Sequence, residues 1–143
     1  MPEMQKARNM WDTQRNIPVS AIPPIFRRSE EVFFKLIRDF HRICMALSCQ
    51  PEVDCNSVKD HTNEIIALLK DDERMLLSLA NAPYNFVHRR LGGSPEVSEM
   101  VTIHGVNVMI YALKISKYIG VSDARLPYIG VSALTSHLGL LGI

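Results

Sequence analysis

The stretch 94–120, SPEVSEMVTIHGVNVMIYALKISKYIG, decides the fold class of this chain. Its opening Ser-Pro-Glu supplies an N-cap, a residue suited to the first helical position and an acid that complements the helix dipole. Gly120 supplies the left-handed conformation with which many helices end. Apolar residues between these signals recur at helical spacing, so we predict a long helix over residues 95–119.

The apolar positions of this helix define the face that we expect to be buried. They are Val97, Met100, Val101, Val108, Tyr111, Ala112, Ile115 and Ile119. His104 lies within the same stripe. The pattern therefore predicts that the His104 ring points into the core, where a buried ring nitrogen must be hydrogen-bonded.

Four other segments have helical spacing. They are residues 30–48, a segment capped by Asn56 or Ser57, the short segment 71–81 and residues 125–142. The stretch 84–93, YNFVHRRLGG, is expected to be a loop because its two glycines allow a sharp reversal. No segment shows the sustained period-two alternation of a strand, so we predict an all-α bundle of about five helices.

Prolines concentrate near the N-terminus, where residues 1–28 hold four of the eight. Pro23 and Pro24 should prevent a helix from running through this segment. We therefore predict a proline-rich tail or linker over residues 1–28 and a single helical domain over residues 29–143.

Composition excludes several classes of protein. The net charge of the 143 residues is +1, so no basic surplus exists to hold a nucleic-acid backbone. The three cysteines, Cys44, Cys49 and Cys55, include no C-x-x-C pair, which argues against a disulfide framework or a zinc ribbon. The most apolar stretch, 106–119, is shorter than the roughly 20 residues of a spanning helix. We expect a cytoplasmic protein with no membrane span and no nucleic-acid partner.

The C-terminal third carries a pattern of motifs. HGVNV at 104–108 is followed by the turn GVS at 120–122 and by ALTSHLGLLGI at 133–143. This order resembles the front half of an HD-GYP domain, the bacterial branch of the HD phosphohydrolases that includes cyclic di-GMP phosphodiesterases. In that family the corresponding motifs are H-S-V-N-V, G-[LV]-S and A-L-L-H-D-I-G-K-I-G-I. The helices predicted upstream also look like those that precede the family's catalytic motifs.

The resemblance implies a helical HD-type fold and, in complete members, iron or manganese ions that activate the attacking water. This chain departs from the family at the metal-binding positions. Ser136 and His137 replace the His-Asp doublet, Leu140 replaces the lysine, and the GYP part would follow Ile143. The resemblance thus implies a catalytically degenerate domain of a bacterial, cyclic di-GMP-type signalling protein, which acts in protein interaction or is a fragment of a larger domain.

Two histidines remain as candidate metal ligands. An alternative function is a metal-dependent phosphohydrolase in which His104 and His137 hold iron or manganese and another chain completes the site. The competing interpretation is that both rings belong to the packing surface. A third interpretation is a plain helical protein whose pattern coincides with the family's by chance. The packing of the helices 95–119 and 125–142 against each other bears on that choice.

The run His88-Arg89-Arg90, beside two aromatic residues, has the composition of a phosphate or nucleotide contact. Its alternative is an ordinary exposed loop. His41 and His61 stand among charged residues, which is typical of solvated helix faces. The cysteines have no Cys-His arrangement and are interpreted as small buried hydrophobes. The sequence thus predicts no catalytic residue in this chain.

The C-terminal segment 138–143, LGLLGI, is apolar. In a complete HD-GYP domain further helices would bury it. We therefore expect the apolar C-terminal helix to contact a partner protein or a second copy, and we predict a homodimer through this end.

Overall fold

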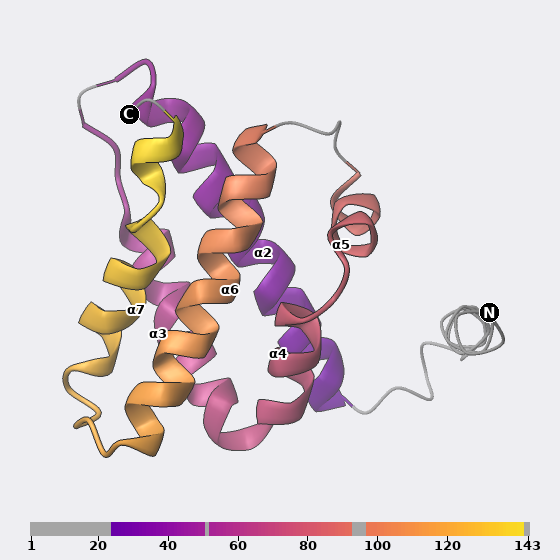
Figure 1. The fold of residues 1–143 in the computed structure, drawn as a ribbon, viewed down its shortest axis with the longest axis vertical. Coiled ribbons are helices and arrows are strands. Elements are labelled where there is room, and N and C mark those ends of the chain that lie inside the picture. The colour runs from indigo at the N-terminus through magenta and orange to yellow at the C-terminus, as the bar shows by residue number, and fades with distance from the viewer. Residues whose placement is uncertain (1–23, 51, 93–96, 142–143) are drawn as a thin grey trace, which may run out of the picture.

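The computed structural model describes residues 24–50, 52–92 and 97–141. Every regular element in these ranges is helical, which confirms the all-α prediction (Figure 1). The elements are α2 (Pro24–Leu47), α3 (Asn56–Asp71), α4 (Glu73–Ala80), α5 (Tyr84–Leu91), α6 (Val97–Tyr118), α7 (Leu126–Thr135) and the 3-10 helix η3 (Leu138–Leu141). No helix in the described ranges is both long and apolar enough to cross a membrane.

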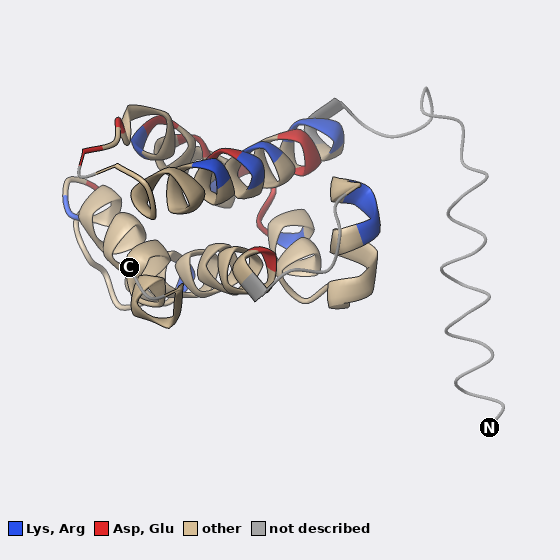
Figure 2. Ribbon diagram, turned by 90° about the horizontal axis from the view of Figure 1, so that it is seen from above, with Lys and Arg blue, Asp and Glu red and all other residues tan. Residues whose placement is uncertain are grey.

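Four helices form the body of the bundle. α2 packs against α3 and α6, and α7 packs against the same two helices from the other side. Figure 2 shows the result as two layers, with α2 and α3 in one and α6 and α7 in the other. α4 lies against α2, α3 and α6 near one end. The predicted C-terminal pair of helices, α6 and α7, thus does pack together.

The core follows the helical period of the sequence. Of the apolar residues that recur at helical spacing on α2, Leu47 is half-buried and the others are buried: Phe33, Leu36, Ile37, Phe40 and Cys44. On α3 the same holds for Val58, Ile65, Ile66 and Leu69. Full burial of one such aliphatic or aromatic side chain stabilises a fold by about 1.5–3 kcal/mol relative to exposure. These two helices were predictable because each is apolar on one face alone.

The prediction for α6 was wrong in its choice of face. The buried side chains of this helix are those of Glu99, Thr102, Ile103, Val106, Met109, Ile110, Leu113 and Ser116. They lie opposite the predicted stripe, of which Met100, Ile115 and Ile119 are 51%, 59% and 69% exposed. His104 is likewise exposed rather than pointing into the core. Because α6 is apolar on both faces, periodicity alone does not select the buried one.

Two glycines allow α7 to pack closely against its neighbours, α6 and α3. A Cβ atom on Gly105 would lie 2.8 Å from the backbone oxygen of Leu134 on α7. A Cβ atom on Gly130 of α7 would lie 2.6 Å from Cγ2 of Thr62 on α3. Both distances are shorter than carbon contacts in packed proteins allow, so these sites accept only glycine without rearrangement.

Three predicted boundaries require correction. The tail was predicted to reach residue 28, but α2 begins at Pro24, because proline is tolerated in the first turn of a helix. The rest of the predicted tail, residues 1–23, lies outside the described residues. The predicted loop 84–93 contains α5, which ends at Gly92 with a φ of 70°. The last predicted helix is interrupted after Thr135 and continues as η3.

The end of α6 agrees with the sequence. Gly120 has a φ of 79°, and the backbone N–H of Val121 donates to the carbonyl of Ser116. This is the left-handed helix termination predicted from the glycine. The following turn is tied to α3, since Lys70 donates to Asp123 across 2.9 Å. That hydrogen bond and the Lys70 charge lower the pKa of Asp123.

The Gly105 contact gives a first prediction. Gly105→Ala should lower the free energy of unfolding by about 1–2 kcal/mol, because the crowding against a backbone oxygen outweighs the roughly 1 kcal/mol by which alanine favours a helix interior. Urea denaturation measures the change. Gly139→Ala is the control, since nothing lies within 4 Å of a Cβ there. A Gly105→Ala chain as stable as the parent would contradict the packing described for α6 and α7.

Candidate functional site

The most unusual surface of the molecule is the side of α6 turned away from the core. We call it the α6 outer face. Its exposed members are Met100, His104, Ile115, Tyr118 and Ile119, and Val101, Val108 and Ala112 are half-buried. Tyr111 lies beside them but packs against the core. Tyr118, at 87%, is the most exposed of its apolar residues. An amphipathic surface helix normally turns charged residues to this side, so the apolar composition of this side of α6 is unusual.

Charge is scarce around the α6 outer face. α7 has no charged residue between Leu126 and Thr135. Figure 2 shows the contrast: the α2 and α3 layer carries many blue and red segments, while the α6 and α7 layer is almost entirely tan. Glu99 is buried against His88, and Lys114 is paired with Glu73 of α4. The surface therefore has few groups that need water.

His104 and His137 lie together on this surface. Their rings are 4.5 Å apart between centroids, with an angle of 84° between their planes. The Ser136 hydroxyl donates to the carbonyl of Ala133 and also lies 2.8 Å from Nδ1 of His137. The two residues proposed as metal ligands from the sequence are thus neighbours, one on α6 and one just after α7.

The donor set around these two rings is small. In residues 24–50, 52–92 and 97–141, no group of three or more His, Cys, Asp or Glu side chains is placed to hold a metal ion. Ser136, which stands at the family's histidine position, is a far poorer ligand than imidazole. Two imidazoles alone fall short of the three or four protein ligands of typical catalytic or structural sites. A metal held here would need ligands from elsewhere.

The run His88-Arg89-Arg90 does not form one anion-binding cluster. Nδ1 of His88 lies 2.5 Å from Oε1 of the buried Glu99 on α6. Arg90 pairs instead with Glu30 of α2 and lies over the ring of Phe34, 5.6 Å from its centroid. Only Arg89 of the three has no ion pair among those found in the described chain. The side chains predicted to contact phosphate therefore serve mainly to attach α5 to its neighbours.

Tyr84 completes the attachment of α5. Its ring stacks on His88 at 5.5 Å between centroids. Its hydroxyl is buried and makes no hydrogen bond of ordinary geometry. Burial and the nearby Glu99 carboxylate raise the pKa of Tyr84, because both disfavour the phenolate.

The raised pKa of Tyr84 gives a second prediction. The folded chain holds this proton more tightly than the unfolded chain does. Its stability should therefore fall as the pH rises above the ordinary tyrosine pKa of about 10. Tyr84→Phe should remove this decrease in the free energy of unfolding at alkaline pH. Tyr118→Phe, at an exposed position, should leave the decrease unchanged. Urea denaturation at a series of alkaline pH values tests both; equal alkaline loss in the parent and Tyr84→Phe would contradict it.

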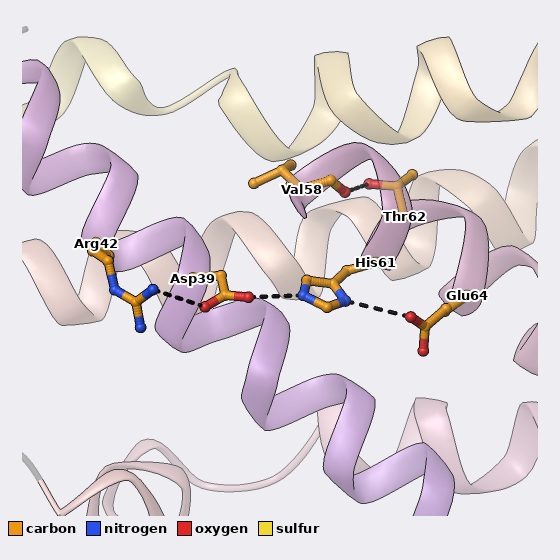
Figure 3. A network of polar contacts seen from close by, with 6 residues as sticks. All are labelled: Asp39, Arg42, Val58, His61, Thr62 and Glu64. Carbon is orange, nitrogen blue, oxygen red and sulfur yellow. Dashed lines mark hydrogen bonds and ion pairs between the residues drawn. The ribbon is translucent and has the colours of Figure 1, made fainter. Parts of the chain in front are cut away.

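A buried polar network joins α2 to α3 (Figure 3). Nε2 of His61 lies 2.8 Å from Oδ2 of Asp39, and Nδ1 lies 3.6 Å from Oε1 of Glu64. Arg42 contacts the other oxygen of Asp39 at 3.5 Å. His61 is only 5% exposed, so the prediction that it belongs to a solvated face was wrong. Asp39 compensates the desolvation of Nε2, while Nδ1 is buried without a hydrogen-bond partner.

The sequence contained a signal for His61. Val58, Ile65 and Leu69 define the buried face of α3, and His61 is one turn from two of them. A histidine at such a position faces a neighbouring helix. Its hydrogen-bond partner is therefore expected on that helix rather than among the charged residues next to it in the sequence. No cavity adjoins this network among those found, and we interpret it as a structural link.

The network gives a third prediction. Asp39→Ala should lower the free energy of unfolding by about 1–3 kcal/mol, because it leaves a buried imidazole nitrogen without its partner. Arg42→Ala is the matched control: its side chain is 78% exposed, and removing it should cost about 0.5 kcal/mol or less. Chemical denaturation at neutral pH compares the two. Equal effects would show that His61 does not depend on Asp39.

The remaining candidate groups offer no chemistry. Nε2 of His41, half-buried on α2, lies 3.1 Å from Oγ of Ser98 on α6. Burial raises the pKa of the Cys44 thiol, which keeps it protonated and a poor nucleophile. Cys49 and Cys55 are exposed, contrary to the prediction that the cysteines are buried. A shallow hollow beside α6, lined by Leu69, Glu73, Lys114, Lys117 and Tyr118, is half open and holds no second acid.

Comparison of the chain with protein-family models, curated proteins and solved structures gives no match. The function must therefore be argued from the geometry of the α6 outer face and its histidines.

Proposed function

We propose that this chain is a non-catalytic helical interaction domain that binds protein through the α6 outer face. The resemblance of its motifs to HD-GYP domains supports a role in bacterial signalling of the cyclic di-GMP type, with the ancestral site lost. The observation that carries the proposal is the exposure of Met100, Ile115, Tyr118 and Ile119 on one side of α6 and at its end, at 51%, 59%, 87% and 69%. Soluble monomers rarely expose a continuous apolar patch of this extent without a function.

The composition of the face supports binding to protein. Its exposed aromatic residue is Tyr118, and Tyr128 of α7 is 76% exposed. Tyrosine, methionine and aliphatic residues are enriched at the centres of protein interfaces, where charged residues are depleted. A nucleic acid or an anionic small molecule would require the opposite composition.

The absence of catalysis is tested directly. The parent chain with added manganese or iron should not hydrolyse cyclic di-GMP or bis(p-nitrophenyl) phosphate above the rate of the metal ion alone. The physical reason is that two imidazoles leave the bound water without a carboxylate partner. Hydrolysis that disappears in His104→Ala but persists in His41→Ala would overturn this part of the proposal.

The binding role of the face is tested with an apolar fluorescent dye at high dilution. The parent chain should bind the dye, and Ile115→Glu should reduce the bound fluorescence several-fold. Asn63→Glu, at an exposed site on α3, should not. Circular dichroism confirms that both variants remain helical. Equal fluorescence from the parent and Ile115→Glu would show that the α6 outer face is not an accessible apolar surface.

A second candidate function rests on the contact between His104 and His137. We propose as the alternative that this pair holds iron or manganese with ligands from another chain, as in a phosphohydrolase divided between two polypeptides. Elemental analysis after purification with added metal should then find about one metal ion for each pair of His104 and His137. His137→Gln should lose this metal. A metal-free chain that shows no hydrolysis excludes this alternative and leaves the interaction domain.

A further inference from the structure

We infer that the solvent-exposed side of α2 binds an acidic segment of a partner protein through a row of cations. This surface lies in the α2 and α3 layer, where Figure 2 shows blue segments along α2. The inference therefore goes beyond the proposed function and does not depend on the α6 outer face. We call the surface the α2 basic face. Its members, all exposed, are Arg28, Glu31, Lys35, Arg38, Arg42 and Met45.

The spacing of these residues makes a continuous row. Steps of three and four residues alternate from one member to the next, and such steps place side chains on one side of an α-helix. The first and last cations, Arg28 and Arg42, are separated by about 21 Å along the helix axis. The row is therefore long enough to contact several side chains of one extended or helical segment.

The two half-buried carboxylates of α2 are already paired within the chain. Glu30 forms an ion pair with Arg90 of α5. Asp39 contacts His61 of α3 at 2.8 Å and Arg42 at 3.5 Å. These acids hold neighbouring helices together and so neutralise little of the charge on the exposed side.

The cations of the α2 basic face exceed the acids that could balance them. No ion pair found within the described part of the chain includes Arg28, Lys35 or Arg38. Glu31 is the one acidic member of the row. The overall net charge of +1 thus hides a positive surface, because acids elsewhere in the chain balance these cations only in the total.

The composition of the α2 basic face is typical of an interface. Three of its four cations are arginine, and Met45 at its end is 48% exposed. Arginine and methionine are enriched at protein interfaces, whereas lysine and glutamate are depleted there. The planar guanidinium group also binds a carboxylate with two parallel hydrogen bonds. Carboxylates are therefore ligands that this row can recognise.

The pattern of charge favours a protein segment over a nucleic acid. Tight binding of DNA neutralises on the order of 6–10 phosphates, and the row has four cations. Every nucleotide of a nucleic acid carries a phosphate, so one would meet Glu31. A protein segment can place acids opposite the cations and a neutral or basic residue opposite Glu31.

Fluorescence anisotropy with a labelled peptide tests the inference. The probe is an alanine-rich peptide about 18 residues long, enough to span the row as a helix, with glutamates at alternating steps of three and four residues. The parent chain should bind it, and binding should weaken as salt is added, because exposed ion pairs are screened. A peptide with glutamine in place of each glutamate should not bind. Equal binding of the two peptides, or none of the glutamate peptide, overturns the inference.

A matched pair of variants locates the binding surface. Lys35→Glu should weaken binding of the glutamate peptide at least fivefold, because it places a repulsive charge in the middle of the row. Lys59→Glu makes the same change at an exposed site on α3 and should weaken binding less than twofold. Circular dichroism checks that both variants remain helical. If Lys59→Glu weakens binding as much as Lys35→Glu, the peptide responds to net charge alone and the α2 basic face is wrong.

Two further anionic probes test the class of partner. A single-stranded DNA oligonucleotide and phosphatidylserine vesicles should bind the parent more weakly than the glutamate peptide does at the same salt concentration. Tighter binding of either, lost in Lys35→Glu, would make the surface a nucleic-acid or membrane site and overturn the acidic protein segment. Lys35→Glu should still bind the apolar dye like the parent, so that failure of this inference is distinguishable from failure of the proposed function.

Discussion

The close contact between Gly105 and the backbone of Leu134 is the constraint on which the arrangement of the bundle depends. A side chain at Gly105 would push α7 away from α6, and a side chain at Gly130 would push α7 away from Thr62 of α3. With the glycines in place, α6 turns Met109 and Leu113 into the core and leaves an equally apolar face outside. The orientation of α6 therefore determines both which of its faces is buried and which is exposed.

The sequence correctly predicted the buried faces of helices that are apolar on one side only, and the helix end that a glycine caps. α2 and α3 were placed correctly because their charged residues mark the solvent side, and Gly120 correctly predicted the end of α6. The burial of α6 was not predictable from periodicity because both of its faces are apolar. α5 was missed because only Val87 of its eight residues is buried, so it has no apolar stripe.

The candidate site was partly predictable. His104 and His137 were selected from their motif positions and are neighbours in space. The exposure of His104 was not foreseen, because it follows from the rotation of α6. The pairing of His88 with Glu99 and of His61 with Asp39 depends on which helices meet, and no local pattern contains that information. The proposed binding surface was itself identified in the sequence as an apolar stripe, but was assigned to the core.

The uncovered stripe of α6 has a consequence for how this chain can change over generations. Solvent-facing positions of a helix usually accept most substitutions, since little touches them. If a protein partner covers the stripe, positions such as Ile115 and Ala112 are subject to the same selection as interior residues. Natural variation would then be restricted on both sides of α6, because one side would pack within the chain and the other would contact another chain.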